Sequence, residues 1–212
     1  MSDPVKVIIC FAVKEEAAPF RPLVAGRSDV QMVVTGMGAK NASVSFLAAL
    51  EKATPGFVIT AGYAGGLNPG LPPESVVLDA TADFPVAGKL LQAGAQKGTF
   101  LCTTTVASTK QEKAALFSRT QCDAVEMESG IIREICAERG IPAATVRVIS
   151  DAAHEDLPLN FNELMTPEME MNFGKLAWTL LKSPGKIPEL MRFQKRVQSS
   201  ALKLAQVLSA SL

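Results

Sequence analysis

The chain has 212 residues, a length that fits one domain with a full hydrophobic core. Hydrophobic residues make up 48% of it and charged residues 20%, and 21 basic residues balance 21 acidic ones. Because the chain has neither a net positive charge nor a dense basic run, we expect no nucleic-acid partner and favour a small molecule as the ligand.

The residue content also limits the location and the cofactors that we expect. The N-terminal MSDP leads straight into apolar residues, without the charged region, apolar region and cleavage site of a signal peptide. No apolar run reaches the ~18 residues that a membrane span needs. The chain has one histidine, His154, and its cysteines form no CxxC pair, so we expect no metal site and no cofactor. These features predict a cytoplasmic protein with reduced, buried thiols at Cys10, Cys102, Cys122 and Cys136.

Apolar runs of strand length follow one another along the chain, at residues 5–13, 30–35, 57–61, 76–78, 99–106 and 143–149. Stretches between several of them are typical of helices, at residues 41–53, 110–118 and 127–139. The last of these has apolar residues at helical spacing and a stop signal at Gly140 and Pro142. Continuous apolar strands that alternate with helices predict a largely parallel sheet covered on both faces.

Two regions follow a different pattern. Residues 83–98 are rich in glycine and alanine, which predicts a short hairpin or a loop. Residues 162–181 have a helical pattern that Ser183, Pro184 and Gly185 interrupt, and a second helix is expected from about residue 188 to residue 208. This helical pair carries no catalytic spacing, and we expect it to cover one face of the sheet or to meet a partner subunit.

Carboxylates stand at the ends of three predicted strands. Glu16 follows the first strand, Glu126 and Glu128 flank Met127 in VEMES, and Asp151 ends the run VRVISD. In an open α/β sheet, ligands bind at the carboxyl ends of the strands, so these acids are expected to converge beside the glycine-rich AGYAGG at residues 61–66. Convergent carboxylates suit an acid, a base and a hydroxyl clamp that act on one sugar.

Each of these features also has a purely structural interpretation. Glu16 and Glu128 are in positions where an acid complements a helix dipole, and Asp151 is in a position for an N-cap. AGYAGG has the composition of a tight turn, and Met127 has the character of a core residue. His154 has no serine or cysteine partner in a recognisable motif, which favours a surface or loop position.

Four segments, AVKEEAAPF, ITAGYAGGLNPGL, AVEMES and VRVISDAAHEDLP, together resemble the superfamily of nucleoside phosphorylases and nucleosidases, the purine and uridine phosphorylase type. Within it, the chain is most similar to methylthioadenosine/S-adenosylhomocysteine nucleosidases. The segment LPLNF is also similar to hopanoid-associated nucleoside phosphorylases, which act on adenosyl groups of lipids. The resemblance covers residues 5–164. It implies one α/β domain over residues 1–212, a three-layer sandwich whose mixed, mostly parallel sheet is flanked by helices.

The resemblance also implies a reaction, the hydrolysis of the N-glycosidic bond of a purine nucleoside of the adenosine type. Glu16 matches the acid that activates water, and Glu128 matches the acid that binds the ribose hydroxyls, with Met127 packed on the sugar. Asp151 matches the acid that protonates N7 of the leaving base, with Ser150 beside it. The chemistry supports these roles, because a purine leaves poorly as an anion and a carboxylate stabilises the cationic sugar. It predicts a shielded Asp151.

Further substrate contacts follow from the same resemblance. Val106 and Ala107 fall near the backbone segment that binds the edge of the base. Gly62 and Ala64 match the turn beside the ribose and the nucleophile, and Tyr63 lies between them where the family usually has a small hydroxyl residue. Glu126 belongs to the same VEMES segment and is expected in the substrate site.

Phosphate is the competing nucleophile, because the superfamily also contains phosphorylases. These enzymes place arginine after the first strand and before the glycine turn, where this chain has Glu16 and Thr60. A carboxylate at the first position repels phosphate, which favours hydrolysis. Phosphorolysis stays open because another cation, at Lys14, Arg21, Arg27 or Lys40, can supply the charge.

The chain departs from the family at three places. Tyr63 is bulkier than the usual residue, and the region 79–99 is shorter than in typical members of the family. The segment VASTKQEKA lacks the aromatic residue that stacks on the base. Tyr63 leaves open a third function, a nucleoside-binding module without turnover. The resemblance and the surplus helical surface of the C-terminal pair predict a homo-oligomer, with a dimer favoured.

Overall fold

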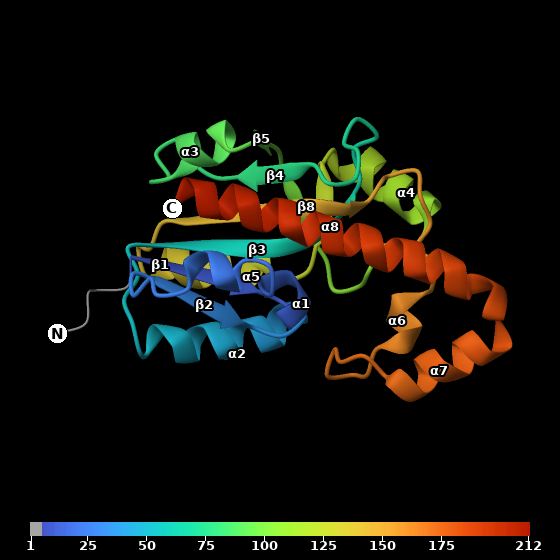
Figure 1. Ribbon diagram of the computed structural model, residues 1–212. Helices are drawn as coiled ribbons and strands as arrows, with labels where there is room; N and C mark the ends of the chain where they lie inside the picture. The colour runs from blue at the N-terminus through green and yellow to red at the C-terminus, as the bar shows by residue number, and fades with distance from the viewer. Residues whose placement is uncertain (1–5) are drawn as a thin grey trace.

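The apolar runs pair into one eight-stranded sheet in the computed structural model, which describes residues 6–212 (Figure 1). The strands are β1 (Val7–Phe11), β2 (Val30–Val34), β3 (Phe57–Gly66), β4 (Val76–Asp79), β5 (Ala95–Lys97), β6 (Phe100–Cys102), β7 (Ala124–Glu126) and β8 (Ala143–Asp151). The main sheet has the order β2-β1-β3-β8-β4-β5, and β6 joins through β7, which pairs with β3.

The sheet is mixed and mostly parallel, as predicted. β1 pairs in parallel with β2 and β3, and β3 pairs in parallel with β8. β4 is antiparallel to β8, and β7 is antiparallel to the end of β3. Because β1, β3 and β8 run in the same direction, their carboxyl ends meet at one edge of the sheet.

Helices cover both faces of the sheet and make the three layers of Figure 1. They are α1 (Lys14–Ala17), α2 (Gly38–Leu50), α3 (Ala87–Gln92), α4 (Lys110–Thr120), α5 (Ser129–Glu138), α6 (Phe161–Leu164), α7 (Phe173–Lys182) and α8 (Ile187–Ser211), with short 3-10 helices η1 (Arg21–Val24) and η2 (Pro184–Lys186). Over residues 6–212, none of these helices is both long and apolar enough to cross a membrane.

The alternation of side chains along β1 builds two hydrophobic cores. Val7, Ile9 and Phe11 point to one face, where they form a cluster with residues of α3 and α8. Ile8 and Cys10 point to the other face and join a cluster with residues of α2 and α5. Because both faces of the strand are covered, every residue of β1 is buried, which explains its unbroken apolar sequence.

Most predicted elements form, with shifted ends. The expected helices 41–53, 110–118 and 127–139 correspond to α2, α4 and α5, and the expected strands 30–35, 57–61, 76–78 and 143–149 correspond to β2, β3, β4 and β8. The expected strand 5–13 corresponds to β1, except that Val5 lies outside the described residues. The second C-terminal helix, expected over 188–208, is α8.

Four predictions of local structure are wrong. The segment AGYAGG, expected as a turn, continues β3 as an extended strand to Gly66. The strand expected over 99–106 is limited to β6, because Thr103 bonds to the Thr105 carbonyl (2.8 Å) and turns the chain. Residues 83–98 form α3 and β5, since the apolar Leu90 anchors a helix in the core. The helix expected over 162–181 is divided into α6 and α7 by a turn that contains Pro167 and is closed by a bridge between Met165 and Met171.

The thiols are only partly buried. Cys10 and Cys136 lie in the core, as expected. Cys102 is exposed because β6 lies at the margin of the sheet, and Cys122 is half-buried on the loop between α4 and β7. All four cysteines are free. His154 is exposed on the loop after β8, as expected.

Candidate functional site

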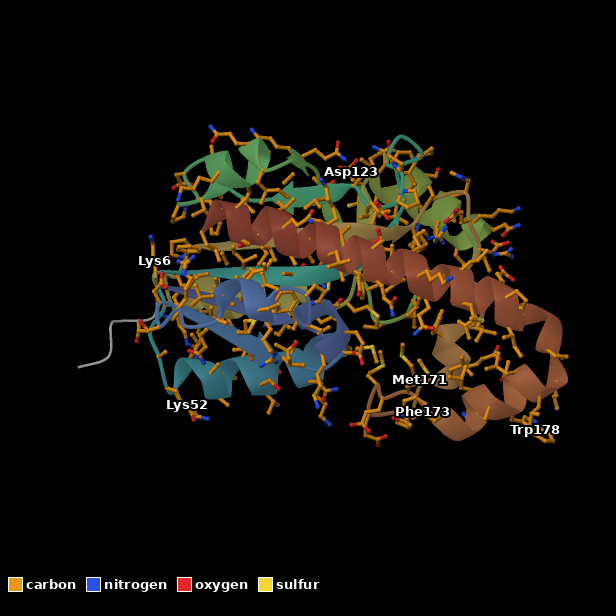
Figure 2. All side chains as sticks on the ribbon, viewed as in Figure 1. Lys6, Lys52, Asp123, Met171, Phe173 and Trp178 are labelled. Carbon is orange, nitrogen blue, oxygen red and sulfur yellow. The ribbon has the colours of Figure 1, made fainter. Side chains whose placement is uncertain are left out.

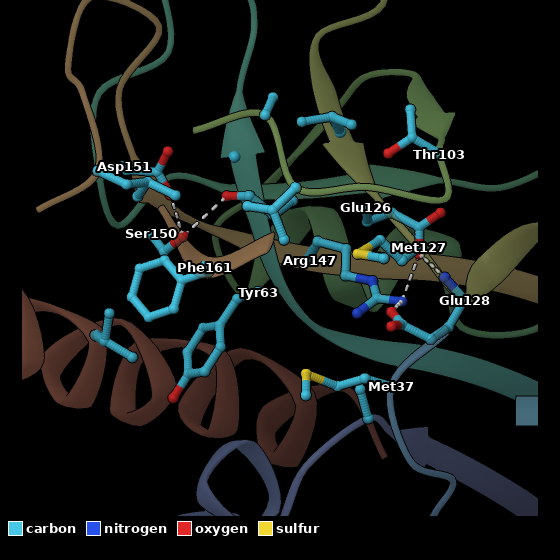
Figure 3. Close-up of a pocket in the computed structure, with 18 of the residues that line it drawn as sticks. Met37, Tyr63, Thr103, Glu126, Met127, Glu128, Arg147, Ser150, Asp151 and Phe161 are labelled. Carbon is cyan, nitrogen blue, oxygen red and sulfur yellow. Dashed lines mark hydrogen bonds and ion pairs between the residues drawn. The ribbon is translucent and has the colours of Figure 1, made fainter. Parts of the chain in front are cut away.

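A cavity of about 250 Å³ opens at the carboxyl ends of β1, β3 and β8 (Figure 3). Ten of the eleven residues predicted for the site line it. They are Glu16, Tyr63, Ala64, Val106, Ala107, Glu126, Met127, Glu128, Ser150 and Asp151. The fold therefore brings together side chains from segments that lie far apart in the sequence.

Glu16 is held by backbone N–H groups. The short helix α1 begins directly after β1 and turns the Glu16 carboxylate back toward the strand end, where Oε2 accepts hydrogen bonds from the backbone of Ala12 (2.8 Å) and Val13 (3.1 Å). Oε1 accepts a hydrogen bond from the Tyr63 N–H at 2.8 Å. Burial raises the pKa of Glu16 to about 7, although Arg147 and these N–H groups act in the opposite direction. Such a carboxyl group changes its charge near neutral pH.

Arg147 is the centre of a buried charge network. It lies in the middle of β8 with 2% of its surface exposed, and its Nη2 donates to Glu126 Oε2 (2.6 Å) and to Glu128 Oε2 (3.2 Å). Figure 3 shows the guanidinium between these two carboxylates. Burial alone lowers the pKa of Arg147, but Glu126, Glu128 and Glu16 together raise it above its ordinary value. Arg147 is therefore a permanent cation whose charge is compensated from several sides.

Glu126 and Glu128 differ in how free they are. Glu126 accepts hydrogen bonds from the N–H groups of Glu128 (3.0 Å) and Ser129 (2.8 Å) and from the Ser129 hydroxyl (2.7 Å), in addition to Arg147. Burial acts to raise the pKa of Glu126, but Arg147 and these hydrogen bonds hold it below its ordinary value. Glu128 accepts from Arg147 and from the Gly38 N–H (3.0 Å) at the start of α2. Glu126 thus anchors Arg147, whereas Glu128 keeps acceptor capacity toward the cavity.

Gly62 is the one predicted site residue that does not line the cavity. It lies in β3 with a φ of 152°, directly behind Glu16 and Arg147. A Cβ atom at this position would collide with the Glu16 carboxylate and would lie 2.6 Å from Arg147 Nη1. Glycine is therefore required here because two buried side chains cross the backbone of β3.

Asp151 is shielded, as predicted, and it has a partner that the sequence did not reveal. It is 4% exposed, and its carboxylate forms an ion pair with Lys113 of α4, which is fully buried. Lys113 Nζ also donates to the carbonyl groups of Ala152 (3.0 Å) and Glu155 (2.8 Å). The Ser150 hydroxyl donates to Asp151 Oδ1 at 2.6 Å. Every proton of the ammonium group has an acceptor, so the pair is fixed in position.

Helix α4 places Lys113 beside Asp151 through its N-terminal cap. Thr109 accepts a hydrogen bond from the Glu112 N–H (3.2 Å), and Glu112 Oε2 accepts from the Thr109 N–H (3.0 Å), a capping box. This cap fixes the first turn of the helix directly after the segment with Val106. The segment that is expected to bind the base therefore leads directly into the capped helix that carries the lysine.

The backbone of Val106 is already paired. Its N–H donates to Asn162 Oδ1, and its carbonyl accepts from Asn162 Nδ2, both at 2.8 Å. Asn162 belongs to α6, so a side chain from the C-terminal region occupies the backbone groups expected to bind the base. The carboxamide presents one acceptor and one donor side by side, which is also the pattern of an adenine edge.

The C-terminal region supplies the aromatic wall. Phe161 of α6 and Phe193 of α8 line the cavity together with Tyr63, and the rings of Phe161 and Phe193 lie 6.1 Å apart. These phenylalanines provide the apolar surface that VASTKQEKA lacks. Phe193 shows that the tail takes part in the site although the tail contains no motif, whereas Phe161 belongs to the segment LPLNF.

Sequence reasoning missed the cations and the residues from the C-terminal region. Arg147 could have been found, because a lone arginine inside an apolar strand must be paired when it is buried. Nothing in the pattern of α4 distinguishes Lys113 from a solvated lysine. The four cations considered for phosphate, Lys14, Arg21, Arg27 and Lys40, do not line the cavity.

The fold and the site define a class of protein, a three-layer α/β domain with a small-molecule cavity at the carboxyl ends of its parallel strands and buried carboxylates in the cavity wall. A family model described as the Phosphorylase superfamily matches residues 11–85 and 79–182. The match covers most of the chain, and the chain belongs to this superfamily. This result confirms the family that the four sequence segments indicate.

Individual proteins agree with this membership. The 5′-methylthioadenosine/S-adenosylhomocysteine nucleosidase of Marinomonas sp. (strain MWYL1) is 27% identical over 190 residues, which cover 73% of this chain and 81% of that protein. The structure of futalosine hydrolase of Helicobacter pylori matches with a TM-score of 0.71 and 17% identity over 98% of this chain and 97% of that chain. A 5′-methylthioadenosine/S-adenosylhomocysteine nucleosidase from Helicobacter pylori with butyl-thio-DADMe-Immucillin-A matches with a TM-score of 0.70, 16% identity and 97% coverage of both chains. These structural matches confirm the predicted fold.

Proposed function

We propose that this protein hydrolyses the N-glycosidic bond of a purine nucleoside of the adenosine type. The relatives that match over most of the chain are named nucleosidases, so the chain is assigned to the enzymes of this class. The observation that carries the proposal is the convergence of Glu16, Glu128 and Asp151 in one cavity. Each acid is held by different partners and faces a different part of a bound nucleoside.

Asp151 acts on the leaving base. The purine takes up a proton at N7 as the bond breaks, because it leaves poorly as an anion. The Lys113 ammonium and the Asp151 carboxylate form an ion pair that is shielded from water, and the Ser150 hydroxyl fixes the orientation of the carboxylate. The proton passes from Lys113 Nζ through the Asp151 carboxylate to N7 and leaves Lys113 neutral.

Glu128 and Arg147 act on the sugar side. Glu128 Oε1 is held by the Gly38 N–H and Oε2 by Arg147, which leaves acceptor positions for the ribose hydroxyls. The carboxylate also stabilises the positive charge that develops on the sugar ring. Met127 lines the same wall and offers an apolar thioether to the sugar face.

Glu16 acts on the water. Its carboxyl group has a pKa raised to about 7, so a large fraction is ionised at neutral pH and accepts a proton from an attacking water molecule. Arg147 lies beside Glu16, because a Cβ atom at Gly62 would contact both side chains. The cation supplies hydrogen-bond donors that orient the same water molecule.

Hydrolysis is favoured over phosphorolysis by the charges of the cavity. Among the described residues that line it, Arg147 is the one cationic side chain, and Glu126, Glu128 and Glu16 compensate its charge. Inorganic phosphate carries about two negative charges near pH 7 and requires uncompensated cations. A neutral water molecule meets no such requirement.

A second cavity of about 540 Å³ adjoins the first, and both are lined by Met37, Thr103 and Met127. Because Met127 is also the residue that packs on the sugar in this proposal, the second cavity gives space to a substituent on the ribose. We therefore expect that nucleosides with a bulky 5′ substituent are accepted.

The test is the release of free base from methylthioadenosine, adenosylhomocysteine, adenosine, inosine and futalosine, with and without phosphate. Free sugar in phosphate-free buffer supports the proposal. Release that depends on phosphate would show phosphorolysis, and tight binding of intact nucleoside without release would show a binding module. Either result would contradict the proposed hydrolysis.

Substitution separates catalysis from binding. Asp151→Asn should lower kcat by about a hundredfold or more with little change in KM, because its proton is needed mainly in the transition state. Asp156→Asn is the matched control, since Asp156 lies on the same loop and is exposed. If Asp151→Asn keeps nearly full kcat, the assignment of Asp151 as the acid is wrong.

A further inference from the structure

Residues 172–192 form an arm that consists of α7, η2 and the start of α8, and it projects beyond the sheet (Figures 1 and 2). No residue of α7 is buried. Of the nine large hydrophobic side chains that are exposed among the described residues, five lie on this arm. They are Phe173, Trp178, Leu181, Ile187 and Met191.

The apolar side of α7 is wider than the part that the protein covers. Leu176 and Leu180 are half-buried against the rest of the molecule, whereas Phe173 and Leu181 are both 74% exposed and Trp178 is 60% exposed. Figure 2 places Trp178 at the lower right edge of the molecule and Phe173 at the other end of α7, near Met171. An apolar helix face of this size, left in water, is typical of a surface that binds a partner.

The charge of the arm is mainly positive. Residues 172–192 contain four basic residues and one acidic residue, Glu189, in a chain whose formal net charge is zero. The basic residues are Lys175, Lys182, Lys186 and Arg192. The acidic residues of the preceding turn, Glu168 and Glu170, belong to a segment that packs toward the start of α2, where the Glu168 carbonyl accepts from Asn41 (2.9 Å). The apolar face is therefore flanked by positive charge.

We infer that the arm docks on an anionic lipid bilayer, with Phe173, Trp178 and Leu181 inserted at the interface. A short amphipathic helix with aromatic and apolar residues on one side and lysines beside them is the pattern of helices that lie in a membrane surface. Lys182 Nζ lies 4.8 Å from the ring centre of Trp178, so the ammonium group stays beside the indole, as in side chains that extend to lipid head groups.

A second copy of the chain fits the arm less well. A two-fold interface places the same patch of both copies in contact, so Lys175 and Lys182 of each copy would face a surface with the same positive charge. An anionic bilayer instead neutralises these residues. Phe161 and Phe193, which lie next to the arm, line the cavity, so docking brings this wall of the cavity toward the membrane surface.

The experiment uses the chain's own fluorescence, because Trp178 is its only tryptophan. The full chain is titrated with vesicles of phosphatidylglycerol and phosphatidylcholine, and separately with vesicles of phosphatidylcholine alone. We expect a blue shift of the emission with the anionic vesicles, weakened by high salt, and co-sedimentation of the protein with them.

Variants that keep Trp178 locate the contact. Phe173→Ser/Leu181→Ser should weaken binding to the anionic vesicles about tenfold or more, and each of Lys175→Gln and Lys182→Gln about fivefold. The matched control is Val44→Ser, which removes an exposed apolar side chain from α2, away from the arm, and should leave binding unchanged. Circular dichroism melting curves of all variants confirm that they are folded.

Two results would overturn the inference. One is the absence of a shift and of co-sedimentation with anionic vesicles. The other is a blue shift of the Trp178 emission with rising protein concentration in buffer alone, which disappears in the variant Phe173→Ser/Leu181→Ser. That result would show that a second copy of the chain covers the arm. The measurement does not depend on the reaction, so a failure of the proposed hydrolysis leaves it interpretable.

Discussion

The ion pair between Lys113 and Asp151 makes a quantitative prediction about stability. Replacing Lys113 by methionine keeps an unbranched side chain that is one atom shorter and removes the charge. Lys113 is fully buried and Asp151 is 4% exposed, so the substitution leaves a buried carboxylate without its counter-ion. The carbonyl groups of Ala152 and Glu155 also lose a donor. Breaking a buried pair in this way costs about 3–5 kcal/mol.

The measurement is unfolding in urea followed by circular dichroism, with the midpoint and slope compared between variants. The loss is large against the ~5–15 kcal/mol that stabilises an ordinary domain, so the midpoint should fall clearly. Lys110→Met is the matched control, because Lys110 is exposed in the first turn of the same helix, and it should change the free energy of unfolding by less than about 0.5 kcal/mol.

The double variant Lys113→Met/Asp151→Asn tests the cause. The double variant has a neutral carboxamide at position 151, so no uncompensated charge is buried. Part of the lost free energy of unfolding should therefore be recovered. We expect the sum of the two single losses to exceed the loss of the double variant by about 1–3 kcal/mol. A loss below about 1 kcal/mol for Lys113→Met, or single effects that add up in the double variant, would refute the reasoning.

Four further predictions concern catalysis, stability and assembly. Because the pKa of Glu16 is raised to about 7, kcat/KM should rise with pH through about 7, and Glu16→Gln should abolish this step; a step that persists in the variant would exclude Glu16 as the base. The raised pKa also means that the protonated Glu16 stabilises the fold below pH 4.5 and that this contribution is lost as pH rises through 7. In urea unfolding, the free energy of unfolding of the wild type should therefore fall by about 3 kcal/mol relative to Glu16→Gln between pH 4.5 and pH 7. Asn162→Ala frees the backbone N–H and carbonyl groups of Val106. KM should therefore fall if the base replaces the Asn162 side chain at these groups. A raised KM would show instead that Asn162 supports the site. Light scattering at micromolar concentration should give twice the mass of the chain, and a monomeric mass would contradict the expected dimer.

Much of the site could be predicted because carboxylates that follow apolar strand segments can be recognised in the sequence. Glu16, Glu128 and Asp151 each follow an apolar run, and the rule that ligands bind at the carboxyl ends of parallel strands is enough to place them together. The same alternation of strands and helices predicts the two covered faces of the sheet. Local errors occurred where composition and tertiary contacts disagree. The glycines in residues 83–98 predict a loop, but this region contains the helix α3 because Leu90 packs in the core.

The class of fold, the family and the positions of the three acids can be inferred from local patterns and motifs along the chain. The contacts of these acids, by contrast, follow from tertiary packing. Lys113 lies on a helix where nothing marks it as buried, Arg147 pairs with carboxylates that are distant in the sequence, and Asn162 reaches Val106 across 56 positions of the chain. Such contacts depend on how α4, β8 and α6 pack around one cavity, and that packing is set by the whole core rather than by any one segment.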